Sequence, residues 1–547
     1  MSRFLATMLD TAAHSDRGMT TGEPTTPVRT PWPDVHSRAR GMAGALRAAG
    51  VAPRAAVGIL AGQPALIAPA AQAVWLCGGS VTMLHQPTAR TDLMAWAEDT
   101  VAVLRMVDAG LVLLGAPFDG LAPVLTERGI PFRVLHELDG EPVEPAVDVA
   151  GEGDTALLQL TSGSTAKPKA VRITHGNLHA NITAMTATAQ LDPARDVLVS
   201  WLPLFHDMGM VGFLTTPMVC GLELVTVTPM DFLSRPTLWA ELISKYRGSV
   251  TAAPNFAYSV LARRLARAEA GSLDLSSMRF ALNGAEPIDP GVVEAFAEAG
   301  ARFGLSPDCV VAAYGMAETA LGVSFAPIDT GLQVDQVDAH ALESQRRALP
   351  AMYGPSRRFP KLGPPLPGIE VRVVGEGGRV LGEREVGVLQ LRGESVTPGY
   401  LTVQGPIATQ DAQGWFDTGD EGYLAEGSVV VCGRRKDVII MAGRNIYPTD
   451  IERAAAGADG VRAGNAVAVR LDAADGRHRE SFTVAVESRQ AGTEDEQRIR
   501  SDVTSRVVSA VGVRPAEVVV LTPGSLPKTP SGKLRRAATA ALLLARG

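Results

Sequence analysis

The stretch that decides the fold is Leu158-Gln159-Leu160-Thr161-Ser162-Gly163-Ser164-Thr165-Ala166-Lys167-Pro168-Lys169. Its small residues leave backbone amides open, and its hydroxyls and lysines add groups that can hold a polyphosphate. The spacing differs from a P-loop, which needs Gly, four residues, then Gly-Lys-Ser/Thr. Apolar runs at 156–160 and 170–174 flank it, so we expect the loop to join two strands. A solvated turn is the ordinary alternative for this composition, and the rest of the chain has to decide between the two.

The bulk composition is typical of a multidomain globular enzyme. The chain has 547 residues, more than one ordinary domain, and 46% of them are hydrophobic. A net charge of −7 argues against nucleic acid as the main partner. The four cysteines lie far apart and show no CxxC spacing: Cys77, Cys220, Cys309 and Cys432. This pattern favours a reducing cytoplasmic location, and it indicates neither a zinc site nor a disulfide framework.

No transmembrane segment is predicted. The most apolar stretch, 64–84, is interrupted by Pro69, Gln72 and the pair Gly78-Gly79, whereas a spanning helix needs about 20 predominantly apolar residues. A buried helix followed by a strand explains this stretch better. Residues 1–16 carry one arginine and an interrupted apolar run, which is unlike a secretory signal.

Helix and strand patterns alternate through most of the chain. Residues 32–50 have amphipathic helical spacing closed by Gly50, residues 55–61 predict a strand, and residues 177–190 predict another helix. Such alternation predicts a layered α/β sheet with helices packed on its faces. Beyond Gly363 the predicted strands become shorter and richer in glycine and proline, and a smaller α/β unit begins at Ile451.

Polar side chains follow the ends of several predicted strands. His206 and Asp207 come directly after the strand that begins at Val197. Strands at 280–282 and 310–313 lead into two further polar stretches, Asn283-Gly284-Ala285-Glu286 and Tyr314-Gly315-Met316-Ala317-Glu318. Ligands bind at the carboxyl ends of strands in open α/β sheets, so we expect these residues to line the rim of one pocket. For His206 alone, a satisfied core histidine is the alternative.

Together these motifs resemble the adenylate-forming superfamily of acyl-CoA synthetases, luciferases and peptide-synthetase adenylation domains. The resemblance covers nearly the whole chain, with five separated motifs in the family's order. It implies an α/β fold whose large N-terminal region, 1–435, consists of layered α/β subdomains plus a β-barrel. A small mobile α+β lid domain, 436–547, would follow and rotate between two half-reactions about a hinge at Lys436.

The resemblance also implies an ATP site. The opening loop would hold the phosphates through Thr161, Ser162, Gly163, Ser164, Thr165, Lys167 and Lys169. The adenine would lie against Asn283, Gly284, Ala285, Glu286, Tyr314, Gly315 and Met316. Asp420 would accept hydrogen bonds from the ribose hydroxyls, because two carboxylate oxygens match a vicinal diol, and Arg434 would contact ribose or phosphate. Ala166 departs from the family's usual glycine, and a left-handed backbone there would cost about 1 kcal/mol.

The implied catalytic residues are Lys533, Glu318 and His206. Glu318, with Thr161, would ligate Mg²⁺, which prefers hard oxygen ligands shared with phosphate. Lys533 resembles the lysine that enters the site only for adenylation, in which a carboxylate attacks the α-phosphorus of ATP and pyrophosphate leaves. His206 occupies the position where amino-acid-activating relatives have an aspartate, so α-amino acids are disfavoured as substrates.

Within the superfamily the chain resembles fatty acyl-AMP ligases. The stretch Trp201-Leu202-Pro203-Leu204-Phe205-His206-Asp207 looks like that branch, and the segment from Glu318 to Gly363 is longer than in acyl-CoA ligases. The extra residues, about 329–359, match an insertion that packs on the N-terminal region and restrains the lid; an ordinary surface loop with one helix at 338–349 is the alternative. Several short motifs look most like the acyl-AMP ligases of mycobacterial (mycobactin-type) siderophore assembly.

This branch implies a fatty acid as substrate and the phosphopantetheine arm of an acyl carrier protein as acceptor, in lipid or siderophore biosynthesis. A medium- or long-chain acyl-CoA synthetase is the second possibility. A non-catalytic acyl- or nucleotide-binding relative is the third, and the presence of Glu318, Asp420 and Lys533 argues against it.

Overall fold

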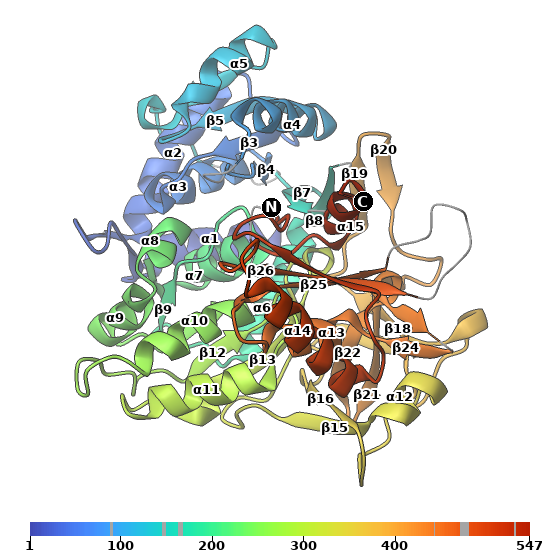
Figure 1. Ribbon diagram of the computed structural model, residues 1–547. Coiled ribbons are helices and arrows are strands. Elements are labelled where there is room, and N and C mark those ends of the chain that lie inside the picture. The colour runs from blue at the N-terminus through green and yellow to red at the C-terminus, as the bar shows by residue number, and fades with distance from the viewer. Residues whose placement is uncertain are drawn as a thin grey trace. The chain divides into compact units, whose positions relative to one another are not determined.

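The computed structural model describes residues 1–87, 91–144, 149–161, 168–441, 443–470, 481–529 and 532–546. The fold is α/β (Figure 1). The chain divides into two compact units. Unit 1 comprises Met1–Leu332, Gly363–Glu370 and Leu391–Phe416, and unit 2 comprises Gln333–Leu362, Val371–Gln390 and Asp417–Gly547. The large α/β part is N-terminal and the small α+β part is C-terminal; the boundary at 435/436 and the β-barrel stay predictions.

The first sheet of unit 1 has the strand order β14-β13-β12-β11-β9-β10-β1-β2 and is parallel except at its two edge strands. Its strands are β1 (Gly18–Thr21), β2 (Val28–Pro31), β9 (Val197–Ser200), β10 (Glu223–Thr226), β11 (Val250–Ala253), β12 (Phe280–Asn283), β13 (Val310–Gly315) and β14 (Gly322–Phe325). The strands predicted at 280–282 and 310–313 are therefore confirmed.

The second sheet of unit 1 has the order β20-β19-β8-β7-β4-β3-β5-β6. Its strands are β3 (Ala56–Leu60), β4 (Ser80–Met83), β5 (Ala109–Leu114), β6 (Phe132–Val134), β7 (Thr155–Thr161), β8 (Lys169–Thr174), β19 (Gly399–Thr402) and β20 (Gly405–Ala408). β7 and β8 are antiparallel, with Thr161 opposite Lys169. The prediction that the opening loop joins two strands is thus confirmed.

Helices of unit 1 pack around these sheets (Figure 1). They are α1 (Arg3–His14), α2 (Trp32–Ala48), α3 (Pro64–Leu76), α4 (Leu93–Met106), α5 (Ala122–Glu127), α6 (His175–Thr188), α7 (Thr216–Cys220), α8 (Pro229–Ser234), α9 (Thr237–Tyr246), α10 (Asn255–Leu265) and α11 (Pro290–Ala301). Short 3₁₀ turns are η1 (Asp119–Leu121), η2 (Leu135–Glu137), η4 (Pro307–Cys309) and η5 (Ala317–Thr319), and η3 (Met208–Thr215) is a π-helix. The stretch 64–84 forms a buried helix and then a strand, as predicted.

In the described parts of the chain, every helix is too short or too polar to cross a membrane.

The carboxyl ends of the parallel strands bring the predicted site residues of unit 1 to the sheet edges. β4 leads into His85 and β9 leads into the turn that holds His206. Two contacts join these edges: the side-chain amide of Gln159 donates to the Phe205 carbonyl over 2.9 Å, and the rings of His85 and Phe205 lie 5.7 Å apart. His85 and Gln159 of the second sheet therefore lie beside the turn that holds His206.

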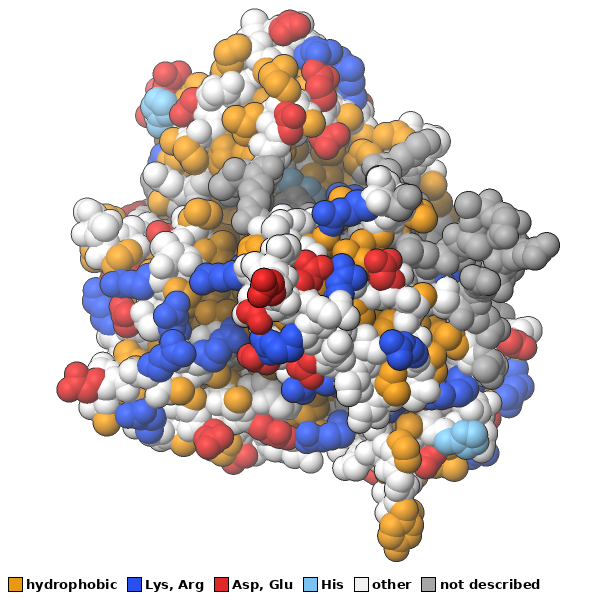
Figure 2. All heavy atoms as spheres, viewed as in Figure 1, with side chains coloured by type: hydrophobic (Ala, Val, Ile, Leu, Met, Phe, Trp, Pro, Cys, Tyr) orange, Lys and Arg blue, Asp and Glu red, His pale blue; other side chains and the backbone are white. Residues whose placement is uncertain are grey.

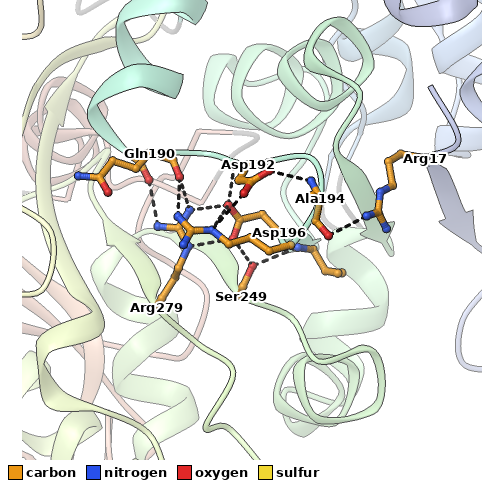
Figure 3. A network of polar contacts seen from close by, with 10 residues as sticks. Arg17, Gln190, Asp192, Ala194, Asp196, Ser249 and Arg279 are labelled. Carbon is orange, nitrogen blue, oxygen red and sulfur yellow. Dashed lines mark hydrogen bonds and ion pairs between the residues drawn. The ribbon is translucent and has the colours of Figure 1, made fainter. Parts of the chain in front are cut away.

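The amino-terminal edge of the first sheet is held by a buried ion network (Figure 3). Asp196 precedes β9, and its fully buried side chain pairs with Arg279, which precedes β12, at 2.5 Å. The Ser249 hydroxyl, just before β11, donates to the other oxygen of Asp196 over 2.8 Å. Arg279 also donates to the carbonyls of Ala189 and Gln190 at 3.0 and 2.9 Å. One carboxylate thus fixes the starts of three strands whose opposite ends build the site.

The remaining strands lie wholly or mostly in unit 2. They are β15 (Val334–Asp338), β16 (Ser356–Pro360), β17 (Ile369–Val374), β18 (Gly387–Gly393), β21 (Phe416–Ala425), β22 (Ser428–Arg434), β23 (Ile439–Met441), β24 (Arg444–Ile446), β25 (Val461–Arg470), β26 (Phe482–Ser488) and β27 (Glu517–Leu521). They form a four-stranded sheet β17-β18-β21-β22, a three-stranded sheet β25-β26-β27, and the pairs β15-β16 and β23-β24.

The helical elements of unit 2 are α12 (Ala339–Gln345), α13 (Pro448–Ala456), α14 (Glu496–Val511), α15 (Arg536–Leu544), η6 (Glu376–Gly378) and η7 (Arg435–Asp437). α14 buries Ile499, Val503 and Val507, whose four-residue spacing places them on one helix face. That face packs in the same core as Phe482 of β26 and Ile451 of α13. The predicted insertion forms β15, α12 and β16, with a helix shorter than the predicted 338–349.

Candidate active site

Glu318 lies in a cluster with Lys169 and Tyr400 inside unit 1. Glu318 is in η5 after β13, Lys169 begins β8, and Tyr400 is in β19. The Tyr400 hydroxyl donates to Oε1 of Glu318 over 2.7 Å. The Lys169 Nζ lies 3.8 Å from the same oxygen and 3.9 Å from the centre of the Tyr400 ring. A carboxylate, an ammonium and a phenol therefore meet at the point where the opening loop enters β8.

The oxygen atoms at this point fit a magnesium ion. Within the described residues both side-chain contacts of Glu318 use Oε1, so Oε2 can take a cation. Thr161, the cross-strand partner of Lys169, has a buried hydroxyl with no partner in the same part of the chain. The described ranges hold no cluster of three His, Cys, Asp or Glu side chains that could bind an ion alone. Mg²⁺ commonly uses one or two carboxylates plus substrate phosphates, which suits this donor set.

The residues predicted to hold adenine follow β12 and β13. Asn283 is fully buried, and its side-chain amide donates to Oδ1 of Asn255 over 3.2 Å. Its own Oδ1 lacks a hydrogen-bond partner among the residues that the structure describes. Glu286 accepts the backbone amide of Phe256 through Oε1 over 2.6 Å, which anchors the start of α10 to this edge. An unpartnered buried acceptor costs about 1–3 kcal/mol, so Asn283 is suited to receive a ligand donor.

The backbone at the same edge is tightly constrained. Ala285 has φ +66°, a left-handed conformation that costs a non-glycine residue roughly 1–2 kcal/mol. At Gly315 a Cβ would lie 2.3 Å from the Leu321 carbonyl oxygen, so only glycine fits. Tyr314 is half-buried and Met316 is buried beside it. Strained backbone concentrates at functional sites, and here it accompanies the predicted adenine residues.

His206 is oriented by its neighbour Asp207. The imidazole Nδ1 lies 2.6 Å from Oδ1 of Asp207, and this oxygen also accepts the Met208 amide over 2.8 Å. Burial and, second, the charge of His206 lower the pKa of His85 to about 4, so His85 is neutral at pH 7. The turn ends in the π-helix η3, an element that is often found at functional sites.

The predicted ribose residues lie together in unit 2. Asp420 of β21 stands directly opposite Arg434 of β22, and the Arg434 Nε lies 2.7 Å from Oδ1 of the buried aspartate. Lys436, the predicted hinge residue, follows in η7. Burial is the main cause that lowers the pKa of Lys436, and repulsion from Arg434 and Arg536 adds to it. The hinge role of Lys436 stays a prediction.

Lys533 lies in unit 2, on the loop between β27 and α15. Its amide donates to Oγ1 of Thr529 over 3.0 Å, and the Thr529 amide donates back to the Lys533 carbonyl over 2.7 Å. Arg536, three residues later, pairs with Asp437 at 3.0 Å and Glu452 at 2.7 Å. The half-buried lysine is thus carried on a loop that is fastened beside the predicted hinge.

Several predicted residues lie outside the described ranges: Ser162, Gly163, Ser164, Thr165, Lys167 and the departure at Ala166. Sequence reasoning also missed two residues that the structure brings to the site, Tyr400 and His85. Tyr400 is the second residue of β19, and the Pro398-Gly399 pair before it was its only local signal. His85 follows β4 as His206 follows β9, and this position after a strand was the available signal. Figure 2 shows acidic and basic side chains interspersed over the visible face, without a uniformly basic area among the described residues.

A family model described as AMP-binding enzyme matches residues 11–401, well over half of the chain. The chain belongs to the AMP-binding enzyme family. ATP is the typical substrate of this family, and this AMP-binding enzyme is an adenylate-forming ligase that activates an acid to its acyl-adenylate.

Three proteins illustrate what this AMP-binding enzyme is similar to. Rv1013 of Mycobacterium tuberculosis, provisionally named a ligase, is 58% identical over 547 residues, which cover 99% of this chain and 100% of that protein. A Caulobacter vibrioides protein provisionally named an acyl-CoA synthetase is 36% identical over 423 residues, covering 76% of this chain and 73% of its own. A solved structure from a study of fatty acyl-adenylate ligases of E. coli and L. pneumophila has a TM-score of 0.89 and 31% identity, and covers 100% of this chain and 98% of that one.

Proposed function

We propose that this AMP-binding enzyme activates a fatty acid as its acyl-adenylate and passes the acyl group to the phosphopantetheine of an acyl carrier protein, in lipid or siderophore biosynthesis. The observation that carries the proposal is an aromatic wall directly beside the polar strand ends. The Trp201 ring stacks on Phe232 at 3.9 Å and meets the edges of Trp239 and Phe256 at 6.1 and 6.2 Å. Trp201, Phe232 and Trp239 are at most 4% exposed, so the partly exposed Phe256 is the member of this wall that a chain of methylenes would contact, at a gain of about 0.8 kcal/mol for each CH₂ buried.

The acid end of the substrate would meet His206 rather than an acidic side chain. An α-amino acid needs a carboxylate to pair its ammonium, and His206 supplies none. Asp207 does not fill that role, because it already contacts the imidazole at 2.6 Å and accepts the Met208 amide. The polar end and the aromatic wall together favour an acid with an apolar tail.

The residues would divide the adenylation chemistry among binding, orientation and charge neutralisation. Asp420 binds the ribose, Lys169 and the opening loop bind the phosphates, and His206 orients the attacking carboxylate. Mg²⁺ held by Glu318 and Thr161 would supply positive charge to the phosphate oxygens when bound. Since the substrate carboxylate is itself the nucleophile, positioning and electrostatics carry the reaction, and losing one such group costs on the order of 10²–10³ in rate.

A buried ion cluster in unit 2 supports a carrier protein rather than free CoA as acceptor. Glu343 of α12 is 2% exposed; its Oε1 lies 2.5 Å from Arg357 and its Oε2 lies 2.5 Å from Arg444. Arg357 also pairs with Asp450 at 3.0 Å and donates to the Ala510 carbonyl over 3.0 Å. The insertion is therefore fastened to the C-terminal segments of its own unit. A lid restrained in this way would disfavour the rearrangement that free CoA requires.

Glu343→Gln is expected to raise the ratio of acyl-CoA to acyl-AMP by roughly tenfold, because an uncharged amide no longer balances two buried guanidinium groups. Mass spectrometry of the products with fatty acid, Mg-ATP and CoA measures the ratio. Glu426→Gln is the matched control, because Glu426 pairs with Lys361 at 2.7 Å in the same unit but is 70% exposed. An unchanged ratio in Glu343→Gln, alongside a lowered melting temperature, would contradict the restraint.

A fatty-acid panel with product identification tests the function itself. Each acid is incubated with Mg-ATP, alone, with CoA and with a holo acyl carrier protein. We expect acyl-AMP to accumulate alone and with CoA, and acyl-carrier thioester to form with the carrier. Abundant acyl-CoA would contradict the proposal and favour the second candidate, an acyl-CoA synthetase like the provisionally named Caulobacter relative.

A further inference from the structure

Unit 1 contains two clusters built from the same three side-chain types, a lysine, a glutamate and a tyrosine. Their members are Lys245, Glu23 and Tyr246 in one, and Lys169, Glu318 and Tyr400 in the other. In the first cluster the Lys245 ammonium and the Tyr246 hydroxyl both lie 2.5 Å from Oε1 of Glu23. The Glu23 side chain is 4% exposed. We call it the closed cluster, because the ammonium and the hydroxyl both reach the buried carboxylate at hydrogen-bond length, although Lys245 itself is 55% exposed.

The second cluster is looser. The Lys169 Nζ lies 3.8 Å from Oε1 of Glu318, which is beyond hydrogen-bond length, and rests on the Tyr400 ring at 3.9 Å. The side chains of Lys169 and Glu318 are 29% and 14% exposed. Lys169 is thus attracted to this carboxylate by charge without a direct hydrogen bond to it. The contact of Lys169 with Glu318 can therefore be exchanged at lower cost than the contact of Lys245 with Glu23.

Glu318 is held in place independently of Lys169. Its backbone carbonyl accepts the Thr397 amide over 2.7 Å, and its Oε1 accepts the Tyr400 hydroxyl over 2.7 Å. Both anchors come from the segment that leads into and forms β19. The carboxylate therefore keeps its orientation when the ammonium moves.

We propose that Lys169 is a displaceable counter-ion of Glu318. In the nucleotide-free protein the ammonium neutralises the carboxylate; when a nucleotide polyphosphate binds beside Lys169, the ammonium turns to the phosphates. Glu318 then becomes available to ligate a divalent cation. Tyr400 is the positioning residue, because its hydroxyl holds Oε1 of Glu318 and its ring supports the ammonium. The inference rests on the proposed function, since it requires a polyphosphate beside Lys169.

The consequence is that nucleotide and divalent cation bind cooperatively. Without polyphosphate, Lys169 and the cation compete for one carboxylate. With polyphosphate, the added negative charge engages Lys169, and the competition ends. Coupling between two ligands is reciprocal, so each ligand increases the affinity for the other by the same factor.

Binding of Mn²⁺ tests this directly, measured by electron paramagnetic resonance with and without α,β-methylene-ATP, which cannot be cleaved between its α- and β-phosphates. In the wild type we expect the analogue and Mn²⁺ each to increase the binding affinity for the other roughly tenfold, within the usual range for coupled sites. Lys169→Met is expected to bind Mn²⁺ alone roughly tenfold more tightly than the wild type and to bind the analogue more weakly. Its coupling should be smaller than in the wild type but not zero, because direct ligation of Mn²⁺ by the phosphates remains.

Two further variants separate charge from positioning. Tyr400→Phe keeps the ring and removes the hydroxyl, so we expect analogue affinity near the wild-type value but Mn²⁺ binding in the ternary complex weakened about fivefold. Lys245→Met is the matched control, because it removes a lysine from the closed cluster at Glu23. It should leave Mn²⁺ binding, analogue binding and their coupling unchanged.

The outcomes distinguish this inference from the proposed function. If the wild type binds the analogue but Lys169→Met binds Mn²⁺ no more tightly than the wild type does, the counter-ion exchange is overturned. The proposed function is not affected by that result. An equal change in Lys245→Met would overturn the counter-ion exchange too, because the effect would then be a general loss of charge. Failure of the wild type to bind the analogue at all would contradict both the proposed function and the inference.

Discussion

Lys533→Ala is expected to lower fatty-acid-dependent ATP–pyrophosphate exchange by on the order of 10²–10³ while leaving acyl transfer from supplied acyl-AMP largely intact. The ammonium offsets charge that spreads over the nonbridging phosphate oxygens as pyrophosphate leaves, and transfer from a preformed adenylate has no such step. The lysine occupies a loop tied back on itself through Thr529 and fastened through Arg536 to Asp437 beside the predicted hinge. Removing the side chain beyond Cβ leaves these loop contacts in place.

Both half-reactions should be measured on the same preparation, exchange with labelled pyrophosphate and transfer by mass spectrometry of the carrier protein. Lys528→Ala is the matched control, because this exposed lysine lies on the same loop five residues earlier. We expect the control to retain both activities. Equal loss of exchange and transfer in Lys533→Ala would show that the lysine does more than assist adenylation.

Arg279→Ala is expected to lower the unfolding free energy of unit 1 by about 3–5 kcal/mol, because it leaves the Asp196 carboxylate buried without its partner. The loss is large for a single substitution, since Asp196 also holds Ser249 and through it the start of β11. Urea unfolding followed by tryptophan fluorescence measures it. Arg195→Ala is the matched control: Arg195 lies 3.8 Å from the same carboxylate but is 55% exposed, and exposed pairs contribute at most about 1 kcal/mol.

The difference in unfolding free energy between wild type and Arg279→Ala should depend on pH. Burial acts most strongly on Asp196 and raises its pKa, but the hydrogen bonds from Arg279, Asp192 and Ser249 outweigh it and lower the pKa overall. A lowered pKa gives stability that is present above the unfolded value of about 4 and is lost as pH falls through the folded value. We therefore expect a large difference in unfolding free energy at pH 7 that becomes smaller below pH 4. A constant difference across this range would contradict the assignment of the effect to the Asp196 carboxylate.

Much of unit 1 could be predicted because its elements carry local signals. The strand-to-strand position of the opening loop followed from apolar runs on both sides of it, and the buried helix and strand at 64–84 followed from Pro69 and the Gly78-Gly79 pair. The strand ends at Asn283 and Tyr314 were predictable for the same reason, since polar residues there interrupt buried runs. Each of these signals is contained in a window of about ten consecutive residues.

Other parts of the site depend on contacts that are remote in sequence. Tyr400 reaches Glu318 because β19 joins the second sheet next to β8, a pairing that no local pattern indicates. The Asp196 network joins residues from 189 to 279 for a similar reason. Glu343 reads as an ordinary exposed helical glutamate, and only the tertiary structure shows it buried between two arginines.

The most direct test of the account is ATP–pyrophosphate exchange by the purified wild-type protein, measured with Mg²⁺ and either a fatty acid, an α-amino acid or no acid. We predict exchange that depends on the fatty acid and is absent without acid or with the amino acid. Exchange supported equally by amino acids would contradict the assignment of His206 and the aromatic wall. No exchange with any fatty acid tested would contradict fatty-acid adenylation itself.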